Sequence, residues 1–110
     1  MKWSIRYYSS SVADEILKFP DGLLAKYLRL IDLMEVYGAN LGLPHTKVVE
    51  AGLLELRVKG KEGIARAFFC TRTGREIIIL HSFIKKTQRI PARELKIARK
   101  RLREVLADET

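Results

Sequence analysis

Basic side chains recur in this sequence at positions where several of them could bind one phosphate. Arg57 lies in a segment that alternates apolar and charged residues, Arg66 lies in the next apolar segment, and Lys85 and Lys86 end a third. An arginine offers a planar fork that can grip two phosphate oxygens, and a lysine offers a point charge. Fixed cations can also stabilise the extra charge of a phosphorane-like transition state. These four residues are therefore the candidate catalytic residues.

Three predicted strands must position these cations. The residues at 54–58 alternate apolar and charged side chains, those at 64–71 are largely apolar and aromatic, and those at 77–84 are nearly all apolar. Gly-Lys-Glu-Gly at 60–63 and Thr-Gly at 73–74 predict tight turns between them. Neighbouring strands of such an antiparallel meander lie about 4.8 Å apart, so their basic side chains can converge on one patch.

The remaining elements predict an α+β fold. A short strand is expected over 2–7, and two helices, ending near Phe19 and Tyr37, form a hairpin that packs on the meander. Residues 38–52 are rich in Gly, Asn and Pro and are expected to be a loop. A basic helix is expected from Pro91 to about Ala107. The chain thus combines an N-terminal strand, a helical hairpin, an antiparallel sheet and a basic C-terminal helix.

Length and composition narrow the class of protein. A chain of 110 residues is expected to form one domain over residues 1–110. Cys70 is the one cysteine, which excludes an internal disulfide and suits a reducing compartment. With two histidines besides, no metal or other cofactor is expected. The sequence shows no signal peptide and no long apolar run, so we expect a cytoplasmic protein without a membrane partner.

The net charge of +8 is concentrated in the second half of the chain. Residues 1–56 carry 6 basic and 7 acidic side chains, and residues 57–110 carry 15 basic and 6 acidic ones. This asymmetry favours a polyanionic partner such as nucleic acid, although a solvated surface or an acidic protein partner would also account for it. The candidate RNA-binding residues are Lys59, Gln88, Arg89 and Arg93.

Each candidate also has a purely structural interpretation. Arg57 can be the exposed face of an edge strand, and Arg66 can be buried in an ion pair, with Glu55 as the partner at hand. His81, within the apolar run, is more simply a hydrogen-bonded core or rim histidine than a base. Residue types alone therefore do not decide between an enzyme and a binding protein.

Three short segments follow one another in a characteristic order. The first is Gly-Leu-Leu-Glu-Leu-Arg at 52–57, the second is Arg-Ala-Phe-Phe at 66–69, and the third is Phe-Ile-Lys-Lys-Thr-Gln-Arg-Ile-Pro at 83–91. The third is the most specific. Together they resemble the HigB-like, phage-associated branch of the RelE/ParE toxin superfamily.

The resemblance implies the toxin of a type II toxin–antitoxin pair. RelE-like members dock in the decoding site of the ribosome and cleave the messenger there without a metal ion. The ribose 2′-hydroxyl attacks the adjacent phosphate, which leaves a cyclic phosphate and a 5′-hydroxyl. The implied partners are the ribosome, its messenger and a cognate antitoxin, which in this branch usually carries a helix-turn-helix.

The resemblance also implies roles for individual residues. Arg57 and Arg66 would bind the scissile phosphate, and Lys86, with Lys85 beside it, would hold that phosphate or protonate the leaving group. Glu55 stands where many RelE-like toxins have a lysine. The general base is either Glu55 or a lysine whose pKa neighbouring cations lower, and we favour the lysine because Arg57 is expected to hold Glu55 in a salt bridge.

Two other functions remain open at this point. A ParE-like inhibitor of DNA gyrase would keep the fold without the nuclease residues, and it would damage DNA while leaving messengers intact. A non-catalytic nucleic-acid-binding module would show strongly salt-dependent binding and no strand scission. The Lys-Lys-Thr-Gln segment at 85–88 favours the nuclease.

Overall fold

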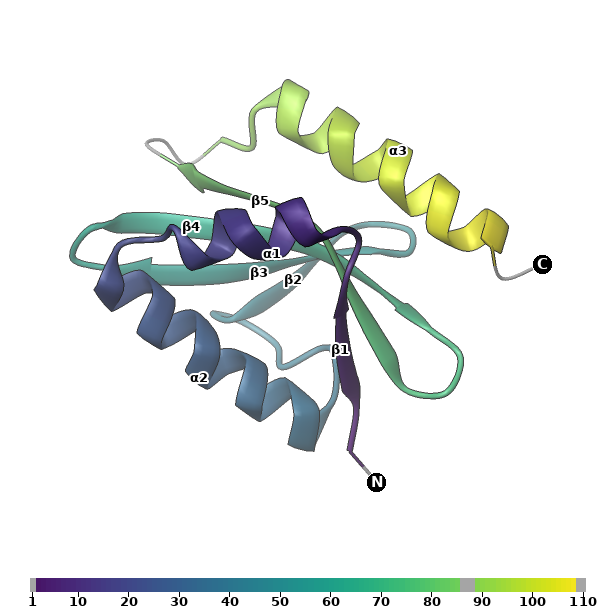
Figure 1. The fold of residues 1–110 in the computed structure, drawn as a ribbon, viewed down its shortest axis with the longest axis horizontal. Coiled ribbons are helices and arrows are strands. Elements are labelled where there is room, and N and C mark those ends of the chain that lie inside the picture. The colour runs from purple at the N-terminus through teal and green to yellow at the C-terminus, as the bar shows by residue number, and fades with distance from the viewer. Residues whose placement is uncertain (1, 86–88, 109–110) are drawn as a thin grey trace.

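The computed structural model of the protein describes residues 2–85 and 89–108. The chain forms five strands and three helices, and the helices lie on the two faces of one sheet (Figure 1). In order they are β1 (Ser4–Tyr7), α1 (Ser10–Leu17), α2 (Asp21–Tyr37), β2 (Thr46–Glu50), β3 (Leu53–Gly60), β4 (Gly63–Arg72), β5 (Glu76–Lys85) and α3 (Ala92–Asp108).

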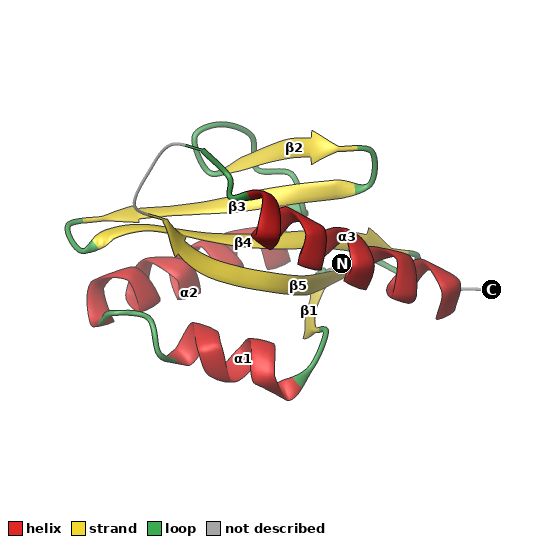
Figure 2. Ribbon diagram, turned by 90° about the horizontal axis from the view of Figure 1, so that it is seen from above, coloured by secondary structure: helices red, strands yellow, loops and turns green. Residues whose placement is uncertain are grey.

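The strands form one mixed sheet in the order β1-β5-β4-β3-β2. Strands β2 to β5 make an antiparallel meander, and β1 pairs with β5 in parallel. The three predicted strands and both predicted turns are confirmed. The loop expected over residues 38–52 is wrong in part, because β2 lies within it at one edge of the sheet (Figure 2). Its five residues show no clear apolar alternation and stand between glycines and a proline, which concealed the strand.

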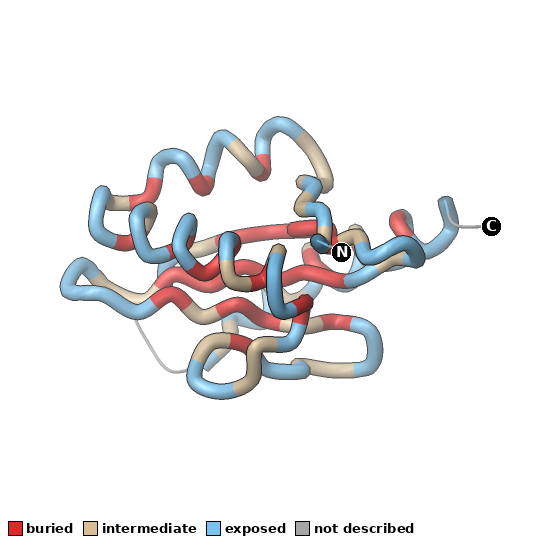
Figure 3. Tube along the Cα trace, turned by 90° about the horizontal axis from the view of Figure 1, so that it is seen from below, coloured by how far each residue is buried: buried red, intermediate tan, exposed pale blue. Residues whose placement is uncertain are grey.

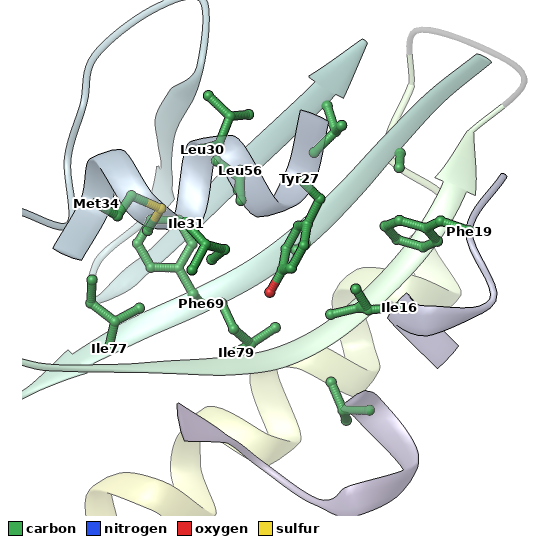
Figure 4. Packing of buried hydrophobic residues seen from close by; sticks show 14 of the residues in the cluster. Ile16, Phe19, Tyr27, Leu30, Ile31, Met34, Leu56, Phe69, Ile77 and Ile79 are labelled. Atoms are coloured by element: carbon green, nitrogen blue, oxygen red, sulfur yellow. The ribbon is translucent and has the colours of Figure 1, made fainter. Parts of the chain in front are cut away.

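Helices α1 and α2 cover one face of the sheet, as the helical hairpin predicted. Tyr27 of α2 and Phe69 of β4 are fully buried near the middle of this core (Figure 4). The hydroxyl of Tyr27 is 2.9 Å from that of Tyr7, so its polar atom is satisfied within the core. Helix α2 ends at Gly38, whose φ of 104° favours glycine. Burial is concentrated in the sheet, and the outer sides of the helices are exposed (Figure 3).

Helix α3 packs on the opposite face of the sheet and lies above it in Figure 1, whereas α2 lies below. Ala98, Leu102 and Val105 recur along one side of α3 and contact the apolar part of that face, which includes Phe68 and Leu80. None of the helices within residues 2–85 and 89–108 is both long enough and apolar enough to span a bilayer. The face that carries α3 continues past the apolar stretch into charged residues, and there the candidate site lies.

Candidate functional site

The register of the meander brings the predicted cations to one face of the sheet. Arg57 of β3 lies directly opposite Arg66 of β4, and Arg66 lies opposite Phe83 of β5. Residues two apart in a strand share a face, so Lys85 points to the same side as these two arginines. On β2, Lys47 is opposite Glu55 and therefore joins the same face. Four neighbouring strands thus each contribute a cation.

A pocket of about 420 Å³ opens among these side chains. Its lining consists of Lys47, Val49, Glu55, Arg57, Arg66 and Ile90. Lys47 is exposed and Arg57 is half-buried, so both can meet a ligand without a rearrangement of the fold. Because Ile90 lies just before α3, the pocket sits where the C-terminal helix begins to cover the sheet.

A buried ion pair forms one wall of the pocket. Arg66 donates a hydrogen bond from its Nη1 to Oε1 of Glu55, and the two residues are only 4% and 0% exposed. The alternative expected for Arg66, a salt bridge with Glu55, is therefore confirmed. The expected salt bridge between Arg57 and this carboxylate is also present, with Nε 3.9 Å from Oε1, but Arg66 is the closer partner.

Two atoms of this pair keep unused hydrogen-bonding capacity. Within the described part of the chain, Oε2 of Glu55 and Nε of Arg66 have no hydrogen-bond partner, although both are buried. Buried polar atoms are normally paired, so such atoms beside a pocket are notable. Because Nη1 of the buried Arg66 guanidinium already donates to Glu55, only its remaining N–H groups can bind a phosphate.

Lys85 lies in a crowded, dry environment at the end of β5. Its side chain is almost entirely buried. Burial lowers the pKa of its ammonium group, and repulsion from Arg66 lowers it further, while Glu55 opposes the change and Arg57 and Lys47 add to it. A larger fraction of Lys85 is therefore neutral at a given pH than for an exposed lysine.

His81 anchors α3 beside the site rather than lining the pocket. Its Nε2 shares a hydrogen bond with the carboxylate of Glu94 in the first turn of α3, and its ring stacks on Phe83 with 6.1 Å between the centroids. Phe83 in turn contacts the ring of Phe68. His81 is therefore a hydrogen-bonded rim histidine, as its place in the apolar run suggested. Across residues 2–85 and 89–108, no three His, Cys, Asp or Glu side chains are grouped as metal ligands would be.

The predicted catalytic residues are brought together as far as the structure describes them. Arg57, Arg66 and Lys85 share one face, and Lys86 lies outside the described residues. Lys47 is a cation of the pocket that the sequence analysis missed. Thr46 and the two valines after Lys47 favour a strand only weakly, and nothing in the sequence indicates that Lys47 shares a face with Glu55.

The predicted RNA-binding residues are more dispersed. Lys59 is exposed at the end of β3, and Arg89 and Arg93 are exposed before and within the first turn of α3. None of these three lines the main pocket, and Gln88 lies outside the described residues. Lys59 lies two residues beyond Arg57 on the same face of β3, and Arg89 adjoins Ile90 of the pocket in sequence.

Three cations and one carboxylate line the pocket, and Lys85 lies on the same face, so the pocket carries a net positive charge. It suits a phosphodiester, whose oxygens accept hydrogen bonds from arginine and lysine. Cations fixed on strands of one sheet lose little freedom when they bind, which is the preorganisation that transition-state stabilisation requires.

The fold is similar to that of a solved structure. The structure resembles RelE in the crystal structure of the archaeal RelE–RelB complex from Pyrococcus horikoshii OT3, with a TM-score of 0.54 and 14% sequence identity. The match covers 78% of this chain and 98% of that one. Comparison with curated proteins finds no match.

The family is defined by the sequence itself. Residues 14–103 match the family model described as phage-derived protein Gp49-like (DUF891). This match includes all of the strands β2 to β5 and most of α3, and the chain therefore belongs to the Gp49-like family.

Proposed function

We propose that this protein is a HigB-like toxin of a type II toxin–antitoxin system and that it cleaves messenger RNA on the ribosome. The observation that carries the proposal is the convergence of Arg57, Arg66 and Lys85 on one face beside a positive pocket. The RelE-like fold and membership of the Gp49-like family support it.

The proposed reaction is an internal transfer at one phosphate. The 2′-hydroxyl oxygen forms a bond to phosphorus, the bond from phosphorus to the 5′-oxygen breaks, and a cyclic phosphate and a 5′-hydroxyl result. A base takes the proton of the 2′-hydroxyl, and an acid gives a proton to the departing 5′-oxygen. No oxidant, reductant or second substrate is needed.

Arg57 is proposed to grip the non-bridging phosphate oxygens, because it lines the pocket and is half-buried. Arg66 adds its charge and its remaining N–H groups, since Glu55 occupies one Nη1 hydrogen bond. Lys85 is the preferred base, because burial and nearby cations lower its pKa. Lys86, its neighbour in sequence, is proposed to hold the phosphate or protonate the 5′-oxygen.

The proposed partners follow from the proposed activity. A nuclease of this kind must be held in check, and the similar archaeal RelE is described in a complex with RelB. We propose a cognate antitoxin of the helix-turn-helix type, with the ribosome and its messenger as the site of action. Lys59, Arg89, Arg93 and Gln88 are proposed to contact RNA around the cleaved bond.

The test is an in vitro translation reaction programmed with one end-labelled messenger. Wild-type protein should produce ribosome-dependent cuts that end in a 5′-hydroxyl, and Arg57→Gln should abolish them while its thermal midpoint is unchanged. Lys61→Gln, an exposed charge change in the β3–β4 turn, is the matched control and should cut normally.

Either of two results would overturn the proposal and indicate a different function. Intact messengers together with inhibited supercoiling by DNA gyrase would identify a ParE-like protein. Salt-dependent binding of RNA without any scission would identify a non-catalytic module, which the burial of Arg66 against Glu55 specifically favours.

A further inference from the structure

A second basic surface begins at Arg57, where the candidate site ends. A hollow of about 200 Å³ shares Arg57 with the main pocket and is also lined by Lys26, His45 and Lys59. A third hollow, of about 610 Å³, shares Lys26 and His45 with the second and adds Arg29. Shared residues thus join three hollows into one path that leads away from the site.

The path exists because β3 extends beyond its edge neighbour. Strand β2 begins at Thr46, which pairs with Leu56, so the rest of β3 has no partner strand on that side. The backbone there is held by other groups. The N–H of Arg57 donates to the carbonyl of His45 over 2.8 Å, and Nζ of Lys26 donates to the carbonyl of Lys59 over 2.7 Å.

The first of these hydrogen bonds runs along the edge of the sheet, and the second ties α2 to the same edge. Lys26 belongs to α2, which covers one face, whereas Arg57 points to the face that carries α3. The path therefore passes around the edge of β3, from the candidate site to the exposed side of α2. In Figure 2 the same edge of the sheet lies beside β2, away from β1 and β5.

We propose that this path binds the sugar-phosphate backbone of the messenger strand next to the cleaved bond. We call it the edge track and define it as Lys26, Arg29, His45, Arg57 and Lys59. The proposal rests on the proposed function, and it deepens that function by assigning a route to the RNA outside the reacting phosphate. Arg29 and Lys26 are exposed on α2, far from Arg57 in sequence but joined to it by the hollows.

The chemistry of the track fits a backbone rather than bases. The second and third hollows are lined by the basic residues and by aliphatic side chains such as Leu33 and Ile64; none of the lining residues is acidic, and His45 is the one with an aromatic ring. Proteins that read or stack single-stranded bases use several aromatic platforms, whereas backbone binding needs cations along a groove. We therefore infer binding that is independent of sequence and strongly dependent on salt.

RNA is favoured over an acidic segment of a partner protein because the track is continuous with a phosphate-sized basic pocket through Arg57. When one phosphate of an RNA chain is bound in that pocket, the neighbouring nucleotides must extend out of it over the protein surface. The edge track offers a cationic route that begins at a residue of the site itself.

The experiment measures binding of labelled single-stranded 2′-O-methyl RNA, which cannot undergo the proposed cleavage. The variant is Lys26→Gln/Arg29→Gln, which removes two charges and keeps polar side chains. The control is Lys96→Gln/Arg103→Gln, the same change of charge at exposed positions of α3. Each protein is titrated with an oligonucleotide of about 4 or about 12 nucleotides at several salt concentrations.

Loss of two phosphate contacts should lower the slope of log K against log salt by about 1.4 for single-stranded RNA. Between about 50 and 200 mM salt, the ratio of wild-type to variant RNA affinity should therefore fall roughly 7-fold. The change should appear with the longer oligonucleotide alone, and the α3 control should retain more of the wild-type slope.

Three outcomes would overturn the edge track. The Lys26/Arg29 variant could match its control with both oligonucleotides, or it could weaken the short and the long one equally. It could also keep its RNA affinity and bind the cognate antitoxin less tightly, which would make this surface a protein interface.

The same proteins separate this proposal from the proposed function. If wild-type protein cuts messengers on ribosomes but the Lys26/Arg29 variant behaves like the control, the track fails and the nuclease stands. If the slope falls as expected while wild-type protein cuts nothing, the RNA-binding surface is supported and the nuclease is overturned.

Discussion

Removal of Glu55 or Arg66 alone should leave a buried charge without its closest counter-ion. Glu55 is fully buried and the side chain of Arg66 is 5% exposed, so water cannot replace the lost partner. Breaking a buried pair in this way costs about 3–5 kcal/mol in free energy of unfolding. A domain of this size has about 5–15 kcal/mol in total, so Glu55→Leu and Arg66→Met should each be close to unfolding at physiological temperature.

The double variant Glu55→Leu/Arg66→Met should be much more stable than either single one. Replacement of a buried ion pair by apolar residues of similar volume is often neutral or stabilising, because neither charge has to be desolvated. We expect the double variant to lie within about 1–2 kcal/mol of wild type. The coupling free energy between the two substitutions should therefore reach at least about 3 kcal/mol, which is near the upper end of the range found for pairs of residues in contact.

The assay is urea denaturation of the four proteins at low temperature, followed by tryptophan fluorescence. An exposed pair, Arg6 and Glu76, provides the control. Its Nη1 and Oε2 atoms are 3.1 Å apart and the side chain of Arg6 is 59% exposed, so its coupling should stay below about 1 kcal/mol. The reasoning would be refuted if the changes in unfolding free energy of the two single variants simply added in the double variant. It would also be refuted if each single variant lost no more stability than a variant of the surface pair.

The remaining predictions concern the two lysines and the rim histidine. Since burial and neighbouring cations lower the pKa of Lys85, its neutral form gains as pH rises, and single-turnover cleavage should accelerate with pH across the neutral range. Lys85→Arg, which stays charged, should be slower by about 100-fold or more, and a flat pH profile in wild type would exclude Lys85 as the base. Lys86→Ala should slow cleavage on the order of 100-fold without a change in thermal midpoint, and full activity would remove it from the site. His81→Ala breaks the hydrogen bond to Glu94 and should cost about 1.5–3 kcal/mol of stability, which an unchanged urea midpoint would contradict.

The meander was predictable because its patterns are local. Strand β3 alternates apolar and charged residues, and the turn at 60–63 places Gly60 opposite Gly63. From these two facts the pairing of Arg57 with Arg66 follows by counting along the strands. The burial of Arg66 against Glu55 was also foreseeable, since an arginine between two alanines in an apolar strand needs an acidic partner.

Other parts of the site depend on tertiary contacts that have no local signature. Strand β2 is short and lies between glycines, so Lys47 could not be assigned to the face of Glu55. In the sequence, Lys26 and Arg29 are typical of the solvent-exposed side of an amphipathic helix. Their relation to Arg57 arises only when α2 packs beneath β3 and Lys26 reaches the carbonyl of Lys59.

The central claim is that cations from adjoining strands gather around one phosphate of a translated messenger. Mapping of messenger ends in cells after brief induction tests it most directly, with wild type compared with Arg57→Gln at equal protein levels. We predict new ends within translated reading frames: each downstream fragment should begin with a 5′-hydroxyl, and each upstream fragment should end in a cyclic phosphate. Both kinds of end should be lost in Arg57→Gln. Intact messengers during growth arrest, or the same ends in the Arg57 variant, would contradict the account.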